Sequence, residues 1–213
     1  YMKFPLIIVG INAGFSLTFM GNTHYAIEDM GIIRCIPGMT IISPSDAGQA
    51  LKAFYASWTL NKPVYIRFTG GLNCPVIYEQ EFNYQIGKGI RLREGNQIQI
   101  IATGSMVDRA LKAAKILEEK GISVDVVDMH TIKPLDTDIL KKDVKLVVSV
   151  EEHSIIGGLG SAIAEALSTY SVHAPLLRLG IGDYFSQVGE YEYLLEQHGL
   201  SPEHIANTIE NNL

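Results

Sequence analysis

Apolar residues along this chain gather in short runs, and the segments between the runs carry apolar residues at helical intervals. The runs at 4–10 (FPLIIVG), 40–42 and 64–68 are rich in β-branched residues. Such runs predict strands that are buried on both faces of a parallel sheet. The segments 25–35 and 47–60 predict helices between these strands. The resulting order of strand, helix, strand, helix and strand is typical of α/β layering.

The rest of the chain repeats this alternation more regularly after a break. Segment 69–83 holds two glycines, Pro75 and several polar residues, and it interrupts the pattern. We therefore predict two domains, residues 1–82 and residues 83–213, with this segment at their boundary. The second domain is predicted to hold strands at 98–102, 124–129, 145–150 and 175–179 and helices at 107–120, 160–169, 191–197 and 201–211.

Polar residues mark the starts of two predicted helices. Ser45 follows Pro44 and is the expected N-cap of the helix at 47–60, because a hydroxyl there accepts a backbone N–H group of the first turn. Ser201 precedes Pro202, and a serine cap followed by proline at the first helical position is a typical helix start.

Composition narrows the class of protein. Hydrophobic residues make up 47% of the 213 residues and charged residues 19%, which predicts a sizeable buried core and disfavours disorder. The net charge is −6 and no long basic stripe occurs, so a nucleic-acid-binding surface is not expected. Cys35 and Cys74 lie far apart, which favours a reducing, cytoplasmic setting over a disulfide framework. No apolar run is long enough to predict a membrane span.

His24 and Arg67 are the leading candidates for a functional site. His24 follows a glycine-containing loop after a predicted strand, where α/β proteins bind ligands, and its imidazole can transfer protons near pH 7. On residue type alone, a structural histidine that caps the next helix is the commoner explanation. Arg67 ends a buried strand, where its charge needs an anion. A ligand phosphate and an ion pair with Glu28 or Asp29 are equally open alternatives.

Other polar residues favour structural roles. Glu28 and Asp29 suit the first turn of a helix, on its surface or at an interface, because the helix dipole favours acidic residues there. Residues 157–161 (GGLGS) open a helix after a strand and suit an anion, but their spacing is weak for a dinucleotide site. His153 is predicted to be structural or to lie on the surface. No Cys/His spacing suggests zinc, and no Gly-x-Ser-x-Gly elbow suggests a hydrolase.

Three segments together resemble the transketolase-type, thiamine-diphosphate enzymes. Residues 21–44 (GNTHYAIEDMGIIRCIPGMTIISP) resemble the end of that family's pyrimidine-binding domain. Residues 100–136 (IIATGSMVDRALKAAKILEEKGISVDVVDMHTIKPLD) and 147–167 (VVSVEEHSIIGGLGSAIAEAL) resemble its C-terminal domain. The resemblance implies an α/β fold in which a truncated parallel-sheet pyrimidine-binding domain precedes a three-layer α/β C-terminal domain.

The resemblance also implies roles for residues of the first part. In the family, the histidine of Gly-x-Thr-His lies beside the reactive carbon of the thiazolium ring, so His24 is expected to be catalytic. Arg67 is expected to hold a substrate phosphate, and Asn12 and Met20 occupy substrate-binding positions. Relatives carry Asp in place of Met20, transketolases carry His in place of Asn12, and deoxyxylulose-phosphate synthases carry a second Arg in place of Gly70. These departures predict a changed substrate.

The resemblance implies that the cofactor site is incomplete in this chain. The family's catalytic glutamate and its stacking aromatic residue precede the matching segment, and a separate domain with a Gly-Asp-Gly motif holds the diphosphate and magnesium. We therefore expect thiamine diphosphate and Mg²⁺ in a full assembly, with no metal site and no cofactor on this chain alone. The expected partner is a missing N-terminal part or a separate diphosphate-binding subunit, within a homodimer or heterotetramer. A start at Tyr1 rather than Met favours a fragment or a processed product.

The function that the resemblance favours is that of the C-terminal portion or subunit of a transketolase-like transferase, which moves a two-carbon ketol unit between small sugar-type substrates. A deoxyxylulose-phosphate synthase-like component and a 2-oxo-acid dehydrogenase E1 β-like component are alternatives, and Thr23-His24 argues against the latter. A catalytically inactive dimerisation module is the non-enzymatic alternative, with Met20 and Asn12 as marks of a decayed site.

Overall fold

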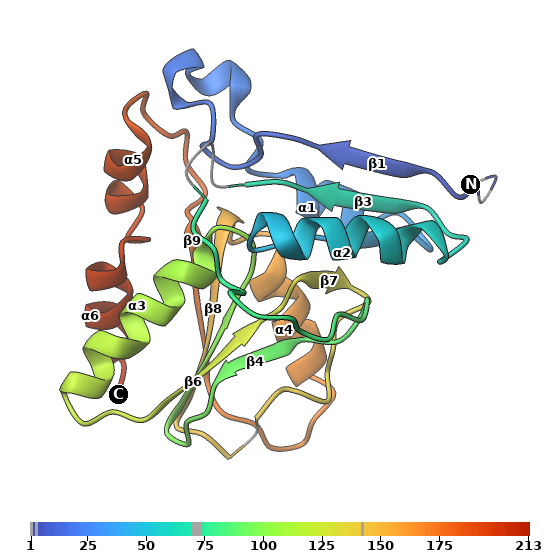
Figure 1. The fold of residues 1–213 in the computed structure, drawn as a ribbon. Helices are drawn as coiled ribbons and strands as arrows, with labels where there is room; N and C mark the ends of the chain where they lie inside the picture. The colour runs from blue at the N-terminus through green and yellow to red at the C-terminus, as the bar shows by residue number, and fades with distance from the viewer. Residues whose placement is uncertain (1, 3, 70–73, 142) are drawn as a thin grey trace.

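The chain folds into two mostly parallel β-sheets with helices packed against them (Figure 1). The computed structural model describes residues 2, 4–69, 74–141 and 143–213. Within these ranges, no helix is both long enough and apolar enough to cross a membrane. The predicted α/β fold class is confirmed, with two mixed, mainly parallel sheets.

The first sheet has the order β1 (Ile7–Gly10), β3 (Val64–Arg67), β2 (Thr40–Ile42) and β7 (Thr131–Lys133). β1 and β2 run parallel to β3, so the carboxyl ends of these three strands lie at the same edge. β7 pairs with β2 in the antiparallel direction. Because β7 comes from the second predicted domain, the two parts of the chain share this sheet. The split between residues 82 and 83 stays a prediction.

The second sheet has the order β4 (Ile90–Arg93), β6 (Val124–Asp128), β5 (Ile98–Ala102), β8 (Leu146–Ser154) and β9 (Leu176–Ile181). All neighbouring strands in this sheet are parallel except β4, which is antiparallel to β6. β5 and β6 are buried along their whole length, which is what the β-branched runs predict.

Helices connect and cover the two sheets. They are α1 (Asp29–Arg34), α2 (Ala47–Trp58), α3 (Met106–Glu119), α4 (Leu159–Leu167), α5 (Tyr191–Gln197) and α6 (Pro202–Glu210), with two 3-10 turns, η1 (Thr18–Met20) and η2 (Asn22–His24). In Figure 1, α3, α5 and α6 lie on one side of the second sheet, and α4 lies on the other.

Three clusters of buried apolar side chains hold these layers together. The largest packs the second sheet against α3, α5 and α6. Another joins both sheets with α1 and α4, through residues such as Met30, Ile41, Val127 and Ile163. A small cluster packs α2 on the first sheet. Each large aliphatic side chain that is fully buried contributes about 1.5 to 3 kcal/mol, so the shared cluster binds the two sheets firmly to each other.

Some element boundaries differ from those that the sequence predicts. α1 is shorter than the predicted helix at 25–35, because Tyr25 is extended and ends η2. The N-cap of α2 is Asp46, whose Oδ1 accepts the N–H group of Gln49 at 2.7 Å, whereas the predicted cap Ser45 donates its hydroxyl to Asp128 at 2.8 Å. The predicted cap Ser201 of α6 is confirmed.

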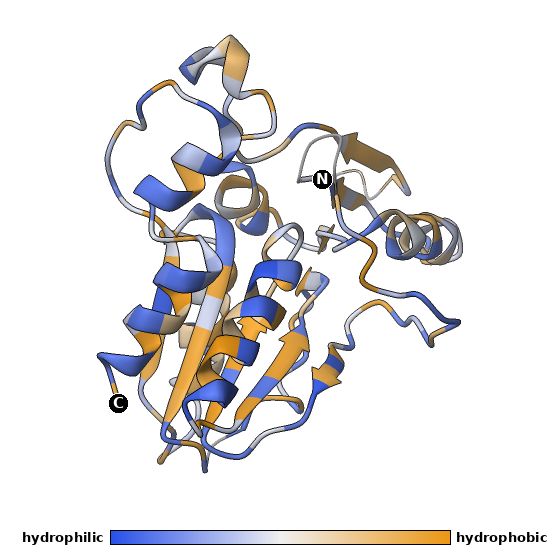
Figure 2. Ribbon diagram, turned by 60° about the vertical axis from the view of Figure 1, so that its left-hand side comes forward, coloured by the Kyte–Doolittle hydropathy of each residue, from blue (hydrophilic) through white to orange (hydrophobic). Residues whose placement is uncertain are grey.

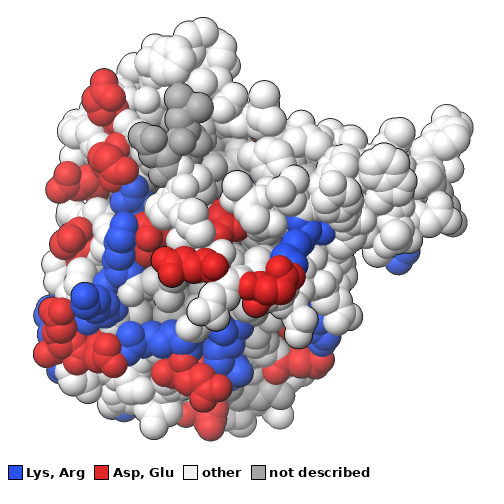
Figure 3. Space-filling view, viewed as in Figure 1, with Lys and Arg blue, Asp and Glu red and all other residues white. Residues whose placement is uncertain are grey.

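The surfaces of the two parts differ in charge. Residues 1–82 contain 10 Asp, Glu, Lys and Arg residues, and residues 83–213 contain 30. On the face shown in Figure 3, charged side chains gather over the second part, and the area over the first sheet is mostly uncharged. Figure 2 shows hydrophobic residues concentrated in the strands of the second sheet, with hydrophilic residues on the helices around it. On the face shown in Figure 3, the second part therefore presents many charged side chains to solvent.

Candidate functional site

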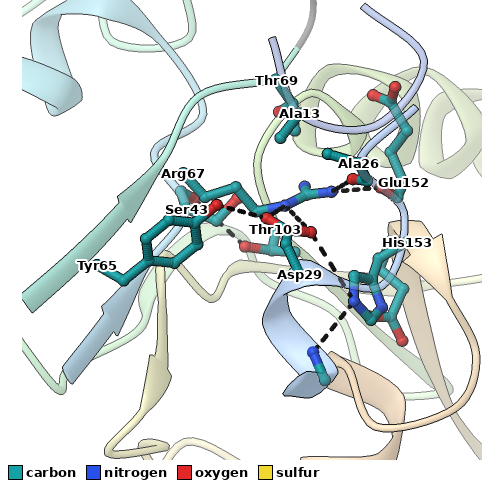
Figure 4. Close-up of polar contacts among 12 residues, drawn as sticks. Ala13, Ala26, Asp29, Ser43, Tyr65, Arg67, Thr69, Thr103, Glu152 and His153 are labelled. Carbon is teal, nitrogen blue, oxygen red and sulfur yellow. Dashed lines mark hydrogen bonds and ion pairs between the residues drawn. The ribbon is translucent and has the colours of Figure 1, made fainter. Parts of the chain in front are cut away.

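The carboxyl ends of strands from both sheets meet at one junction (Figure 4). Arg67 ends β3 beside Gly10, the last residue of β1. From the second sheet, the N–H group of Ser105, which follows β5, donates to Thr69 Oγ1 at 2.9 Å. Arg67 Nη2 donates to the main-chain oxygen of Glu152 in β8 at 2.9 Å. Because ligands of α/β proteins bind at the carboxyl ends of strands, this junction is the candidate site.

A loop that leaves the junction carries the predicted catalytic histidine, and we call residues 11–28 the His24 loop. Two main-chain hydrogen bonds between Gly14 and Ala26, with N···O distances of 2.8 and 3.2 Å, close its base. Between them lie η1 and η2, joined by Gly21. Gly21 has a φ of 73°, in the left-handed region that favours glycine, so the glycine of Gly-x-Thr-His is needed to turn the chain.

The structure places three of the predicted site residues in this loop. His24 is exposed, and its Nδ1 lies 2.9 Å from Thr23 Oγ1. Met20 is 49% exposed, and Asn12 is half-buried with a φ of 57°. An exposed imidazole is open to a ligand, as proton transfer requires. The catalytic role of His24 and the substrate-binding roles of Met20 and Asn12 stay predictions, and Gly70 lies outside the described residues.

Arg67 is buried, and protein groups hold its guanidinium (Figure 4). Its Nε donates to both carboxylate oxygens of Asp29, at 3.0 and 2.8 Å, and its Nη2 donates to the main-chain oxygen of Ala26 at 3.1 Å. Asp29 also accepts the hydroxyl of Tyr65 at 2.8 Å. The ion pair, one of the two alternatives for Arg67, is therefore present, and Asp29 lies between α1 and β3 rather than on an open helix surface. Binding of a substrate phosphate by Arg67 stays a prediction.

Glu151 fills the start of helix α4. This glutamate is fully buried, and its carboxylate accepts the N–H groups of Leu159 at 2.7 Å and of Gly160 at 2.8 Å. A carboxylate is stabilised there by unpaired N–H groups and by the helix dipole. The anion-binding turn that residues 157–161 predict is thus occupied by a side chain of the protein itself.

His153 links helix α1 to the second sheet. It is fully buried, its Nδ1 donates to the main-chain oxygen of Ser154 at 2.7 Å, and its Nε2 accepts the N–H group of Gly31 at 3.2 Å. These two bonds fix a neutral ring with the proton on Nδ1. The same Nε2 lies 4.0 Å from Asp29 Oδ1. His153 is therefore a structural residue, as the sequence predicts, and not a surface one.

Burial shifts the pKa values of these residues in the directions that favour their neutral forms. It raises the pKa of Glu151 to about 7, although the N–H groups of Gly160 and Leu159 oppose the shift. Burial also raises the pKa of the Glu152 carboxyl. Burial, with the nearby charge of Arg67, lowers the pKa of His153 to about 4, so its imidazole is neutral near pH 7.

The described residues do not fit a complete site for a diphosphate cofactor with magnesium. Among them, no group of three or more His, Cys, Asp or Glu side chains could hold a metal ion. Magnesium bound to phosphates needs carboxylate ligands, and a phosphate alone needs free cationic groups. At the junction, Arg67 is already paired with Asp29. The carboxylates of Asp29, Glu151 and Glu152 likewise already accept protein N–H and O–H groups, so the groups described at the junction are not free to hold a diphosphate with its metal ion.

Sequence reasoning does not identify Glu152, Ser105 and Tyr191, which the fold brings together from distant segments. The side chain of Glu152 accepts hydrogen bonds from both other residues. One signal for it exists: Glu151, Glu152 and His153 directly continue the buried run VVSV. Three ionisable residues that extend a core strand must each find a partner, because unpaired buried charge is costly.

Comparison with known families gives two successive matches. Residues 1–74 match the family described as "Transketolase, pyrimidine binding domain". Residues 87–205 match the family described as "Transketolase, C-terminal domain". The loop that carries His24 lies in the first match, and the buried run of β8 lies in the second.

Individual relatives agree with these matches. The chain is 42% identical over 211 residues to a putative transketolase C-terminal section of Methanocaldococcus jannaschii, covering 98% of this chain and 66% of that protein. It is 41% identical over 210 residues to the 6-deoxy-6-sulfo-D-fructose transketolase subunit SqwH of Clostridium sp., covering 96% and 64%. A solved structure described as "Split gene transketolase, inactive beta4 tetramer" has a TM-score of 0.86 at 35% identity, covering 99% and 67%. The chain spans about two thirds of the length of each of these proteins.

Proposed function

The chain belongs to the transketolase family, and we propose that it is the C-terminal component of a thiamine-diphosphate-dependent enzyme that transfers a two-carbon ketol unit. One observation carries this proposal: an exposed Gly-x-Thr-His loop stands where the segment that matches the pyrimidine-binding domain meets the segment that matches the C-terminal domain. Relatives named as a C-terminal section and as a subunit support a component over a complete enzyme.

In this proposal His24 is the group of this chain that meets the substrate. Its exposed imidazole can donate a hydrogen bond to a substrate hydroxyl or exchange a proton with it. Thr23 Oγ1, 2.9 Å from His24 Nδ1, limits the orientation of the ring. Arg67 binds both the loop and α1. Its Nη2 donates to the main-chain oxygen of Ala26 at the loop base, and its Nε pairs with Asp29, the first residue of α1.

The proposed partner supplies the cofactor-binding groups that the described residues lack. It would also cover the apolar surface of the first sheet, where β1 is an open edge strand. An apolar groove of about 710 Å³ lies along this edge and is lined by residues that include Phe4, Leu6, Ile8 and Met39. Open edges and exposed apolar grooves are typical of surfaces that bind another polypeptide segment. A missing N-terminal part and a separate subunit would both fit this edge.

The proposed substrate is an anionic sugar-type ketose whose hydroxyl pattern differs from that of common phosphoketoses. Met20 stands where relatives have an acid, and a thioether cannot accept a hydroxyl as strongly as a carboxylate does. The relative SqwH is named for a sulfonated fructose, which shows that the family's members differ in their anionic sugar. Met20→Asp should therefore leave the native reaction no faster. A clear gain on fructose 6-phosphate with this variant would contradict the altered substrate.

Reconstitution tests the proposed function. The chain is mixed with a polypeptide that carries a Gly-Asp-Gly diphosphate motif, with thiamine diphosphate, Mg²⁺, a ketose phosphate or sulfonated ketose as donor, and an aldose phosphate as acceptor. Mass spectrometry should show an acceptor extended by two carbons only when both polypeptides are present. A complex that binds the cofactor yet transfers no ketol unit from any donor would support the inactive dimerisation module instead.

A further inference from the structure

Glu152 joins four segments that are distant in sequence. Its Oε1 accepts the N–H group of Phe15 in the His24 loop at 2.6 Å. Its Oε2 accepts the hydroxyl of Tyr191, the first residue of α5, at 2.7 Å, and also the hydroxyl of Ser105 at the start of α3. Its main-chain oxygen accepts Nη2 of Arg67. The side chain is only 1% exposed, so these protein groups are its surroundings.

The His24 loop reaches this carboxylate because residue 14 is glycine. A Cβ at this position would lie 2.2 Å from Glu152 Oε1, and the φ of +69° is itself unfavourable for other residues. The next residue, Phe15, is fully buried, and its ring stacks on His198 at 5.1 Å between centroids. The start of the loop is thus held by groups of the second part of the chain.

The far end of the loop is held in the same way. Tyr25, which directly follows His24, packs edge-on against Phe15 at 5.0 Å between centroids and donates its hydroxyl to the main-chain oxygen of Gln187 at 3.2 Å. Ala26 closes the base by pairing with Gly14. In the tip of the loop, which carries η1, η2 and His24, the hydrogen bonds among the described residues stay within the loop itself.

From these contacts we infer that Glu152 is a positioning residue. Its carboxylate fixes the base of the His24 loop against the second sheet and so sets where the His24 imidazole stands. The effect on the loop is independent of any activity, whereas the consequence for catalysis rests on the proposed function. The C-terminal domain would thereby take part in the reaction without touching the substrate.

The chemistry of the junction calls for a carboxylate and not an amide. All three partners of the side chain donate: one main-chain N–H group and two hydroxyls. Burial raises the pKa of Glu152, and those donors together with the charge of Arg67 oppose the rise. Hydrogen bonds to a charged acceptor are stronger than those between neutral groups. A glutamine here would keep the shape and could still accept the N–H group of Phe15, but its NH₂ group would require both hydroxyls to turn and accept, and the charge that strengthens all three bonds would be lost.

Hydrogen–deuterium exchange of the intact chain tests the effect on the loop. In Glu152→Gln, amides at 14–26 should exchange about ten- to a hundredfold faster, the range expected when a hydrogen bond to a charged group is lost. Amides in the core of β5 should keep their rates. Glu151→Gln is the matched control, because it neutralises the adjacent buried carboxylate, which binds the start of α4 instead of the loop.

A second variant keeps the test decisive if Glu152→Gln does not fold. Tyr191→Phe removes one hydroxyl from the carboxylate and should speed exchange at 14–26 by a smaller factor, about three- to tenfold. Unchanged loop exchange in every folded variant at these two positions would overturn the inference. An equal increase in Glu151→Gln would also overturn it, because the effect would then come from general loosening of β8.

Kinetics of the reconstituted enzyme separates this inference from the proposed function. A displaced His24 loop should lower kcat about tenfold or more and leave KM for the donor within about twofold, since His24 acts in the reacting state. Faster loop exchange with unchanged kcat would overturn the catalytic half of the inference. Absence of ketol transfer in the unmodified enzyme would instead count against the proposed function.

Discussion

The two sheets of this protein have similar topology but differ in what they expose. Each combines parallel strands with one antiparallel edge strand, β7 in the first and β4 in the second. Among the described residues, 14 exposed large hydrophobic side chains belong to residues 1–82 and 7 to residues 83–213. The smaller part of the chain therefore carries twice as many. The second part exposes few large apolar side chains, whereas the first exposes an apolar surface that suits contact with a partner.

The two parts also divide the chemistry. The first carries an exposed histidine on a loop whose tip has few anchors. The second carries the buried glutamates and the buried histidine of β8, which hold that loop and α1 in place. A scaffold that positions an exposed loop is a common division in enzymes. The second part of the chain therefore supports the His24 loop and α1 through buried side chains of β8.

Replacement of His24 should give the largest effect on this comparison. In the reconstituted enzyme, His24→Ala should lower turnover about 10²- to 10⁴-fold, the range for loss of a general acid or base. Affinity for thiamine diphosphate should change little. The control is His204→Ala, at an exposed histidine of α6 in the second part. Near-normal turnover in His24→Ala would contradict the proposal that the first part of the chain supplies a catalytic group.

Removal of the buried arginine should give the next largest effect. Arg67→Met leaves the half-buried Asp29 without its cationic partner, which should lower the free energy of unfolding by about 3 kcal/mol, the low end of the range for a broken buried ion pair. The double variant with Asp29→Asn should recover part of this loss, as urea denaturation would show. If Arg67→Met unfolds as easily as the wild type and only raises KM for an anionic substrate, then Arg67 serves the substrate and not the junction.

The pH dependence of stability should reveal the neutral histidine of β8. The pKa of His153 is about 4 in the folded protein, below its ordinary value of 6.5, so the unfolded state binds more protons between these values. The contribution of His153 to the free energy of unfolding should therefore fall by about 2 to 3 kcal/mol as the pH falls from 6.5 to 4, and this share should vanish in His153→Gln. The buried Glu151, whose pKa is raised to about 7, acts in the opposite direction in the same window and is common to both proteins. Urea denaturation of both proteins across this window measures the difference. Parallel pH profiles would contradict the neutral, buried imidazole.

Charge placed on the exposed apolar face of α2 should have the smallest effect on stability. Leu51, Tyr55 and Trp58 lie on this face at helical spacing and are 62%, 69% and 71% exposed. Leu51→Lys should change the free energy of unfolding by less than about 0.5 kcal/mol and reduce binding of a hydrophobic dye. Val172→Lys, an exposed position of the second part, should not reduce dye binding. Equal loss of dye binding in both variants would mean that the two parts of the chain do not differ in exposed apolar surface.

Most of the fold could be predicted from the sequence, because buried strands and amphipathic helices leave periodic patterns. β4 and β7 are not predicted, because the alternation in IRLR spans only four residues and Thr131–Lys133 is too short to carry a pattern. The pairing of β7 with β2 depends on tertiary packing alone. Asp46 replaced Ser45 as the cap of α2 because Asp128, distant in sequence, takes the serine hydroxyl.

The candidate site could be predicted only in part. The Gly-x-Thr-His motif located the loop, since its residues are contiguous. The partners of the Glu152 side chain and the main-chain partners of Arg67 come from segments far apart in sequence, so no local pattern indicates them. The ion pair of Arg67 with Asp29 is among the expected alternatives. For Asp29 the sequence leaves the helix surface, an interface and the ion pair with Arg67 open, and the packing of β3 beside α1 selects the ion pair.

Calorimetric titration of thiamine diphosphate and Mg²⁺ into the isolated chain tests most directly whether the first part is incomplete on its own. The described residues offer neither a cluster of metal ligands nor a free cation at the junction. We therefore expect no saturable binding below about 1 mM, which corresponds to less than about 4 kcal/mol of binding free energy. A low-micromolar Kd would contradict this account, because it would mean that the chain holds the cofactor without a partner.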